Sequence, residues 1–157
     1  MSITEKSILY VEDLDSPREI ITKYVQALGF QNIDSVDSAK NAIAKLQSDS
    51  EKYFCVIADI NMPDVNGIAL VREIRKSDNL KHLPVIMLTA YPTDSNLIEC
   101  IKAGATGFIA KPPKKKLLIE ELEKSLDIFL KKKDPRICNP EDADLVDEAL
   151  SKIRSSV

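Results

Sequence analysis

An uninterrupted apolar run, Phe54-Cys55-Val56-Ile57-Ala58, lies in the middle of the sequence and ends at an acidic residue, Asp59. A second run of the same character, Pro84-Val85-Ile86-Met87-Leu88, is followed by Thr89. Short apolar runs without polar alternation are typical of strands that are buried on both faces, as in a parallel sheet covered by helices. These two runs therefore predict the centre of such a sheet.

Three further runs and five helical patterns extend this prediction along the chain. The runs are Ser7-Ile8-Leu9-Tyr10-Val11, Ile33-Asp34-Ser35-Val36, which is mixed and suits a sheet edge, and Gly107-Phe108-Ile109-Ala110. Apolar residues at helical spacing fill the gaps. Ser16-Pro17 and Gly29 are the expected start and stop of the first helix, and Gly104 is the expected stop of the fourth. Strand and helix thus alternate five times, which predicts parallel strands and a three-layer α/β fold.

Composition and charge exclude several classes of protein. The chain has 157 residues, of which 44% are hydrophobic and 30% charged, so it is expected to form one globular domain. No apolar run approaches the roughly 20 residues of a membrane span, and the N-terminus has no secretory pattern. The net charge of −3 comes entirely from residues 134–157, so no nucleic acid partner is expected. Three cysteines without metal-binding spacing favour a reducing, cytoplasmic location.

Polar residues follow four of the predicted strands: Glu12 and Asp13, Asp59, Thr89, and Lys111. The carboxyl ends of parallel strands meet at one edge of a sheet, so these side chains are expected to converge there. We call this edge the rim. Three crowded carboxylates repel one another, and a hard divalent cation such as Mg²⁺ relieves that repulsion. An aspartate can accept a phosphoryl group, and a lysine ammonium suits a phosphoryl oxygen.

These residues carry a resemblance to a known family. Over about residues 5–132 the sequence resembles the receiver domain of two-component response regulators, of the chemotaxis-regulator-like, single-domain kind. The matching stretches are Ile8-Leu9-Tyr10-Val11-Glu12-Asp13, Asp59-Ile60-Asn61-Met62-Pro63 with Asp64 and Gly67, Leu88-Thr89-Ala90, and Gly107-Phe108-Ile109-Ala110-Lys111-Pro112. The resemblance implies a flavodoxin-like (βα)5 doubly wound sheet with strand order 2-1-3-4-5. We expect a receiver domain at residues 1–132, followed by a linker and an amphipathic helix at 133–157.

The resemblance also implies a role for each rim residue. Asp59 would accept the phosphoryl group from a histidine kinase or a histidine phosphotransfer protein. Glu12, Asp13, Asp59 and the backbone carbonyl of Asn61 would hold Mg²⁺, or Mn²⁺ in its place. Thr89 and Lys111 would each contact a phosphoryl oxygen, and the Lys111-Pro112 bond is a candidate for the cis isomer.

Further roles concern the switch and the lifetime of the phosphoryl group. Thr89 would move toward the phosphoryl group and Phe108 would turn inward, which would change the surface of the fourth helix, fifth strand and fifth helix for a protein target. Phe108 lacks the hydroxyl of the tyrosine that is common at this position, so a hydrogen bond there is not expected. Asn61 and Tyr91 would tune dephosphorylation, and Tyr91 is expected to hinder the attacking water.

The tail predicts a sixth helix of roughly 14 residues. Asn139-Pro140 is the expected N-cap and first helical position, and one apolar stripe follows, formed by Leu145, Val146, Ala149, Leu150 and Ile153. A lone helix of this length is marginal in water, so the stripe should pack on something. Its own receiver, a second subunit in a tail-mediated homodimer, and a partner protein all remain open.

Several functions compete at this stage. The leading hypothesis is a phospho-receiver that signals to a protein partner, relays its phosphoryl group to another histidine, or acts as a phosphate sink. The alternative is a receiver-like binding or dimerisation module that works without phosphorylation. A Mg²⁺-dependent phosphatase is disfavoured because Asn61 stands where such enzymes need a second acid. The chain is therefore not expected to be a conventional enzyme, and would catalyse only its own phosphorylation and dephosphorylation.

Overall fold

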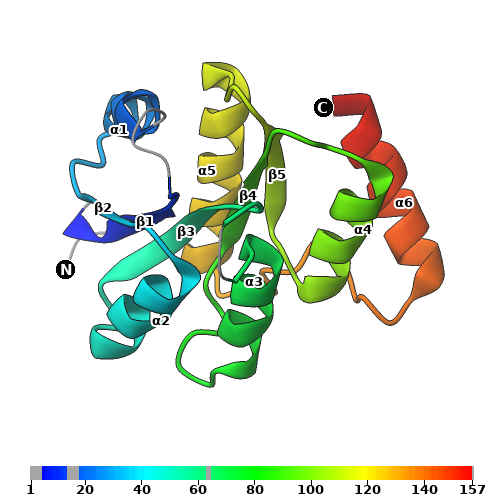
Figure 1. Cartoon of the computed structure of the whole chain (residues 1–157), viewed down its shortest axis with the longest axis horizontal. Helices are drawn as coiled ribbons and strands as arrows, with labels where there is room; N and C mark the ends of the chain where they lie inside the picture. The colour runs from blue at the N-terminus through cyan, green and yellow to red at the C-terminus, as the bar shows by residue number, and fades with distance from the viewer. Residues whose placement is uncertain (1–4, 14–17, 63–64, 157) are drawn as a thin grey trace.

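A five-stranded parallel sheet forms the centre of the protein, with its strands in the order β2-β1-β3-β4-β5. The computed structural model describes residues 5–13, 18–62 and 65–156 (Figure 1). The predicted helix start at Ser16-Pro17 and the motif residues Pro63 and Asp64 lie outside the described residues. The predicted fold class and strand order are confirmed.

Strands and helices alternate along the chain as the apolar pattern predicts. The strands are β1 (Ser7–Val11), β2 (Ile33–Val36), β3 (Tyr53–Asp59), β4 (Val85–Thr89) and β5 (Gly107–Ala110). The helices are α1 (Arg18–Ala27), α2 (Ala39–Ser48), α3 (Gly67–Lys76), α4 (Asp94–Ala103), α5 (Lys115–Leu130) and α6 (Ala143–Ser156). Among the strands, β1, β3 and β4 are buried throughout, whereas β2 is half-buried at the sheet edge, as its mixed sequence predicts.

The two faces of the sheet build two separate cores. Successive side chains of a strand point to opposite faces, so each strand contributes to both cores. On one face Tyr10 and Ile57 pack with residues of α1 and α5. On the other face Val56, Met87 and Phe108 pack with residues of α2, α3 and α4. Helices therefore cover the sheet on both sides, which leaves the ends of the strands as the accessible edges (Figure 1).

Gly104 shows how the sequence ends an element here. It follows α4 with a φ of 101° and its N–H donates to the carbonyls of Cys100 and Ile101. Only glycine adopts this left-handed conformation without strain, so the helix stops at the position that the sequence predicts. The chain turns directly into β5, which brings Phe108 and Lys111 to the sheet.

The sixth helix is present with the predicted length of 14 residues, but its predicted start is wrong. Asn139 accepts a hydrogen bond from Glu141 N in a turn, whereas Asp142 Oδ1 accepts from Asp144 N and Leu145 N at the start of α6. Both residues are good capping residues, and the later one lies three residues before Leu145, the first residue of the apolar stripe. The helix therefore begins at Ala143, three residues further along than Pro140.

The apolar stripe of α6 packs on the chain's own receiver. Val146, Ala149 and Leu150 are buried in the core that contains α4 and Phe108. Ile137 N donates to Ala105 O at 3.1 Å, and Arg154 pairs with Asp94 at 3.1 Å. In Figure 1 α6 lies beside α4, at the end of the sheet formed by β5. Of the three arrangements left open by the sequence, the structure has the intramolecular one.

None of the described helices combines the length and the apolar character that a bilayer span requires.

Candidate functional site

The last residue of β3, Asp59, is the centre of the rim. Its carboxylate is buried, and its Oδ1 accepts a hydrogen bond from Asn61 N at 3.0 Å. Gly67 begins α3 against the same residue, because a Cβ at position 67 would collide with the Asp59 carbonyl oxygen. Gly67 N also donates to Ile60 O at 2.9 Å. The backbone that follows Asp59 is thus held before any ligand binds.

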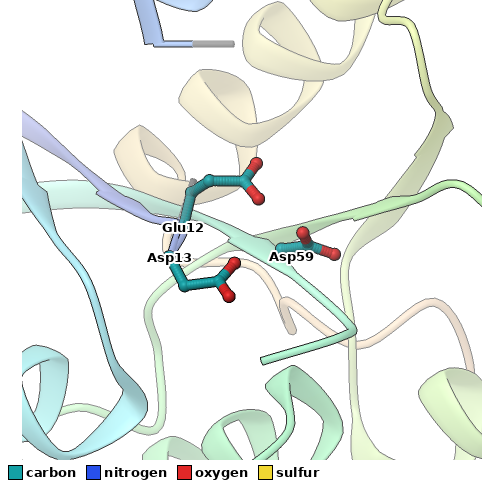
Figure 2. A group of neighbouring side chains, drawn as sticks. All are labelled: Glu12, Asp13 and Asp59. Carbon is teal, nitrogen blue, oxygen red and sulfur yellow. The ribbon is translucent and has the colours of Figure 1, made fainter. Parts of the chain in front are cut away.

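Two further carboxylates follow β1. Glu12 is buried and Asp13 is exposed, yet both side chains point toward Asp59 (Figure 2). Glu12 N donates to Val36 O, which continues the β1–β2 ladder by one residue. One oxygen from each of Glu12, Asp13 and Asp59 lies within 4.8 Å of the others (Figure 2).

This set of oxygens fits a hard divalent cation. Mg²⁺ prefers oxygen ligands and keeps several water molecules, so a site with few protein ligands and one exposed side suits it. The acids that the sequence singles out are brought together as expected. Asn61 is exposed two residues after Asp59, and the role of its backbone carbonyl as a ligand stays a prediction.

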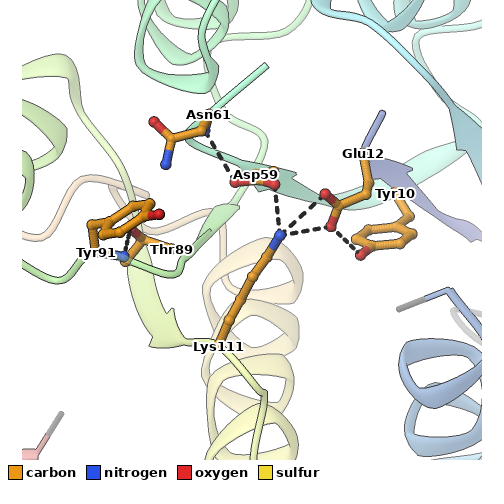
Figure 3. A network of polar contacts seen from close by, with 7 residues as sticks. All are labelled: Tyr10, Glu12, Asp59, Asn61, Thr89, Tyr91 and Lys111. Atoms are coloured by element: carbon orange, nitrogen blue, oxygen red, sulfur yellow. Dashed lines mark hydrogen bonds and ion pairs between the residues drawn. The ribbon is translucent and has the colours of Figure 1, made fainter. Parts of the chain in front are cut away.

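Lys111 links the two buried acids. Its Nζ lies 2.6 Å from Asp59 Oδ2, 2.9 Å from Glu12 Oε2 and 3.1 Å from Glu12 Oε1 (Figure 3). Lys111 N donates to Thr89 O, which anchors the residue to the end of β4, and the Lys111-Pro112 bond is cis as predicted. Lys111 and Glu12 are 99 residues apart in the sequence, and this contact brings them together at the rim.

Burial and charge shape the ionisation of this cluster. Burial, together with Asp59 nearby, raises the pKa of the Glu12 carboxyl above its ordinary value. Burial alone would lower the pKa of the Lys111 ammonium, but its pairing with Asp59 and Glu12 outweighs burial and raises that pKa. One ammonium faces three carboxylates, so the rim keeps an excess of negative charge that a divalent cation would neutralise.

Thr89 and Tyr91 lie on the β4 side of the rim, apart from the Lys111 ion pairs (Figure 3). Thr89 is buried at the end of β4, and its Oγ1 accepts a hydrogen bond from Tyr91 N at 2.9 Å. The Tyr91 side chain is 64% exposed. A movement of the Thr89 hydroxyl toward Asp59 would break its bond to the loop that carries Tyr91.

Comparison with known families supports the geometry. A family model of the response regulator receiver domain matches residues 8–123. The chain belongs to the response regulator receiver family. The match runs from β1 into α5, so α6 lies outside it.

Two chemotaxis proteins are similar to the chain in sequence. The chain is 38% identical to the chemotaxis protein CheY of Pseudomonas aeruginosa over 117 residues, which are 74% of this chain and 93% of that protein. Identity is also 38% with CheY-3 of Vibrio cholerae, over 74% of this chain and 88% of that protein.

Among solved structures, CheY4 of Vibrio cholerae has a TM-score of 0.68 at 28% identity, covering 76% of this chain and 98% of that one. A CheY-like receiver from Methanospirillum hungatei has a TM-score of 0.71 at 26% identity, covering 81% and 98%.

The predicted switch residue Phe108 lies in the core that α6 helps to cover. Phe108 is buried on β5 and belongs to the same core as Val146, Ala149 and Leu150 of α6. A cavity of about 340 Å³ separates part of α6 from β5 and α5, and Phe108 forms part of its wall. α6 therefore packs on α4 and borders β5 and α5, a contact that the sequence analysis leaves open.

The sequence analysis does not predict one contact of the site, which is made by Tyr10. Tyr10 OH donates a hydrogen bond to Glu12 Oε2 at 2.8 Å (Figure 3). The sequence contains a signal for it, because residues two apart on a strand lie on the same face. A tyrosine in a buried strand is, however, typical of an ordinary core position, so the sequence alone does not predict this hydrogen bond.

Proposed function

We propose that this protein is a phospho-receiver that accepts a phosphoryl group on Asp59 and transmits the change to a protein partner. The observation that carries the proposal is the pairing of Lys111 with both Asp59 and Glu12 at the buried rim, with Asp13 beside them. Such a cluster of carboxylates is unfavourable for folding, and none of its members is needed to form the sheet. Its chemistry is that of phosphoryl transfer.

The chemical step is a transfer from a phosphohistidine of a histidine kinase or a histidine phosphotransfer protein. A carboxylate oxygen of Asp59 forms the new P–O bond while the P–N bond breaks, and the histidine nitrogen leaves with the bonding electron pair. Mg²⁺ held by Glu12, Asp13 and Asp59 would neutralise charge on the phosphoryl oxygens. Lys111 would turn from Asp59 to a phosphoryl oxygen, and the Thr89 hydroxyl would donate to another.

The response would spread along β4 and β5. When Thr89 moves toward the phosphoryl group, Phe108, which is already buried, would shift further into the space that Thr89 leaves. The surface of α4, β5, α5 and the adjoining α6 would then change for a protein target. Burial of the α6 stripe on the same chain favours a monomer over a tail-mediated homodimer. The net charge of −3 favours a protein over a nucleic acid as the target. Three free cysteines among the described residues favour the cytoplasm.

On this proposal the protein is not a conventional enzyme, because it catalyses only its own phosphorylation and dephosphorylation. It shares its rim chemistry with relay intermediates and phosphate sinks. A relay intermediate would pass the group on to a second histidine protein, which a transfer assay between purified proteins would detect.

Intact-protein mass spectrometry tests the proposal most directly. After incubation with Mg²⁺ and a small acyl phosphate, the protein should gain the mass of one phosphoryl group. Asp59→Ala or a chelator should abolish the gain. If neither acyl phosphate nor any histidine kinase phosphorylates the wild type, the proposal is wrong and the phosphorylation-independent binding module takes its place.

A further inference from the structure

Tyr10 occupies an unusual place for a polar group. Its ring is 1% exposed and packs in the core between the sheet and helices α1 and α5, among residues such as Ile8, Ile21 and Ile57. Its hydroxyl emerges from this apolar layer at the rim and donates to Glu12 Oε2 at 2.8 Å. A buried phenol needs a partner for its O–H, and here the partner is a carboxylate that faces the candidate metal site.

Glu12 accepts hydrogen bonds from two side chains, and one of these donors is more rigidly held than the other. Lys111 contacts both oxygens of Glu12, but the same ammonium also pairs with Asp59 at 2.6 Å. A lysine is a mobile point charge on a flexible stem. Tyr10 has a ring enclosed by the core and only two side-chain torsions, so its donor position is the more rigid one.

We propose that Tyr10 is a positioning residue, which holds the Glu12 carboxylate in the orientation required for Mg²⁺ through the hydrogen bond from its hydroxyl to Oε2. The inference deepens the proposed function, on which its second part rests. When Lys111 turns toward a phosphoryl oxygen, Glu12 loses that partner, and the Tyr10 hydroxyl is the side-chain donor that stays. The carboxylate therefore keeps its orientation in both states of the rim.

A second tyrosine–carboxylate pair in the same sheet supplies a matched control. Tyr53 is also 1% exposed, and its hydroxyl donates to Asp34 Oδ2 at 2.7 Å. Tyr53 begins β3, at the amino end of the strand whose carboxyl end is Asp59, so its pair is remote from the rim. The substitutions Tyr10→Phe and Tyr53→Phe remove the same atom from the same kind of contact and keep both rings.

A magnesium titration followed by amide NMR shifts tests the positioning role without phosphorylation. Partners that orient a ligating carboxylate typically change metal affinity by about tenfold or more. In Tyr10→Phe the half-saturating Mg²⁺ concentration should rise about tenfold. The phosphorylation rate should fall most at low Mg²⁺ and should recover as Mg²⁺ is raised, since Asp59, Lys111 and Thr89 are intact. Tyr53→Phe should titrate as the wild type does, with a comparable loss of thermal stability.

The intact protein supplies an independent measurement. With ¹³C-labelled tyrosine, the ring signal of Tyr10 should shift as Mg²⁺ is added, while the signal of Tyr53 stays in place. A Tyr10→Phe titration equal to that of wild type or of Tyr53→Phe would overturn the inference, as would a Tyr10 signal that does not respond to bound Mg²⁺. If Mg²⁺ binds but Asp59 is never phosphorylated, the proposed function fails, and the role of Tyr10 in holding Glu12 is decided by the titration alone.

Discussion

The rim and the contact between α4 and α6 are both buried, but the rim consists of charged side chains and the contact of apolar ones. At the rim the protein buries charge: the side chains of Glu12 and Asp59 are 2% and 6% exposed and share one ammonium. At the α4–α6 contact it buries the aliphatic side chains of Val146, Ala149 and Leu150. Burying the charges of the rim costs folding free energy, whereas burying the apolar side chains of the α4–α6 contact stabilises the fold.

This difference indicates that the rim residues serve chemistry and that the residues of the α4–α6 contact serve stability. Buried ion pairs are often no more stable than apolar residues of the same size, so the rim is not explained by folding. An apolar helix stripe needs only a complementary surface, so the α4–α6 contact requires no chemistry to explain it. Substitutions in either region should therefore destabilise the fold, but only those at the rim should also impair phosphorylation.

The largest effect is expected from Lys111→Met, which leaves two buried carboxylates without their shared cation. Removing one partner of a buried ion pair destabilises a protein by about 3–5 kcal/mol, and we expect about 3 kcal/mol in urea unfolding because Lys111 is 18% exposed. Saturating Mg²⁺ should restore part of this loss, since it binds the folded state. Phosphorylation should fall as well.

The matched control is Lys81→Met, which removes a largely exposed ion pair with Asp78. It should change the free energy of unfolding by less than about 0.5 kcal/mol, with no response to Mg²⁺. Equal losses in the two variants would show that the rim does not hold uncompensated charge.

Leu150→Ala tests the other region. Leu150 is 5% exposed, and truncating a buried leucine costs about 2–5 kcal/mol. We expect about 2 kcal/mol, together with faster amide hydrogen exchange in α6. The extent of phosphorylation by acyl phosphate should be unchanged, because α6 contributes nothing to the rim. Leu145→Ala is the control, since Leu145 is 39% exposed and should lose much less. A drop in phosphorylation would mean that the two regions are not separable.

Tyr91→Ala probes the exposed margin of the rim. The Tyr91 side chain is 64% exposed beside Thr89 and is expected to obstruct the water that attacks the aspartyl phosphate. Its removal should shorten the half-life of the phosphoryl group severalfold, an effect of about 1 kcal/mol in activation free energy, with no change in stability. Following the decay by mass spectrometry measures this half-life, and an unaltered decay would exclude Tyr91 from the path of the water.

The smallest effect concerns a carboxylate that behaves unlike Glu12. Burial alone would raise the pKa of Asp34, but Lys52 and Tyr53 outweigh burial and hold that pKa below its ordinary 3.8. A lowered folded pKa contributes stability above the unfolded value, and this stability is lost as pH falls through the folded pKa. Urea unfolding of the wild type should therefore lose up to about 1 kcal/mol more than Asp34→Asn as the pH falls below about 4. Parallel pH profiles would contradict the shift.

Sequence reasoning reached most of the fold because strand and helix patterns are local. The continuous apolar run of β3 and the mixed run of β2 predict their central and edge positions, and Gly104 predicts the end of α4. The start of α6 was misplaced because Asn139 and Asp142 are both competent caps, and only the packing of the helix selects between them. The role of Tyr10 is not predictable from the sequence, because a tyrosine in a buried strand has the pattern of a core residue and only the structure shows where its hydroxyl lies.

The sequence by itself determined that Glu12, Asp13, Asp59 and Lys111 end up at one edge, because parallel strands carry their ends to the same side. Only the tertiary structure decided that the Lys111 ammonium bridges Glu12 and Asp59, that the Tyr10 hydroxyl reaches Glu12, and that α6 packs on its own α4. The physical reason is that a hydrogen bond or ion pair forms only when its donor and acceptor are about 3 Å apart, and a shift of a few tenths of an ångström weakens it. The pairing register of the strands and the packing of the helices set those distances.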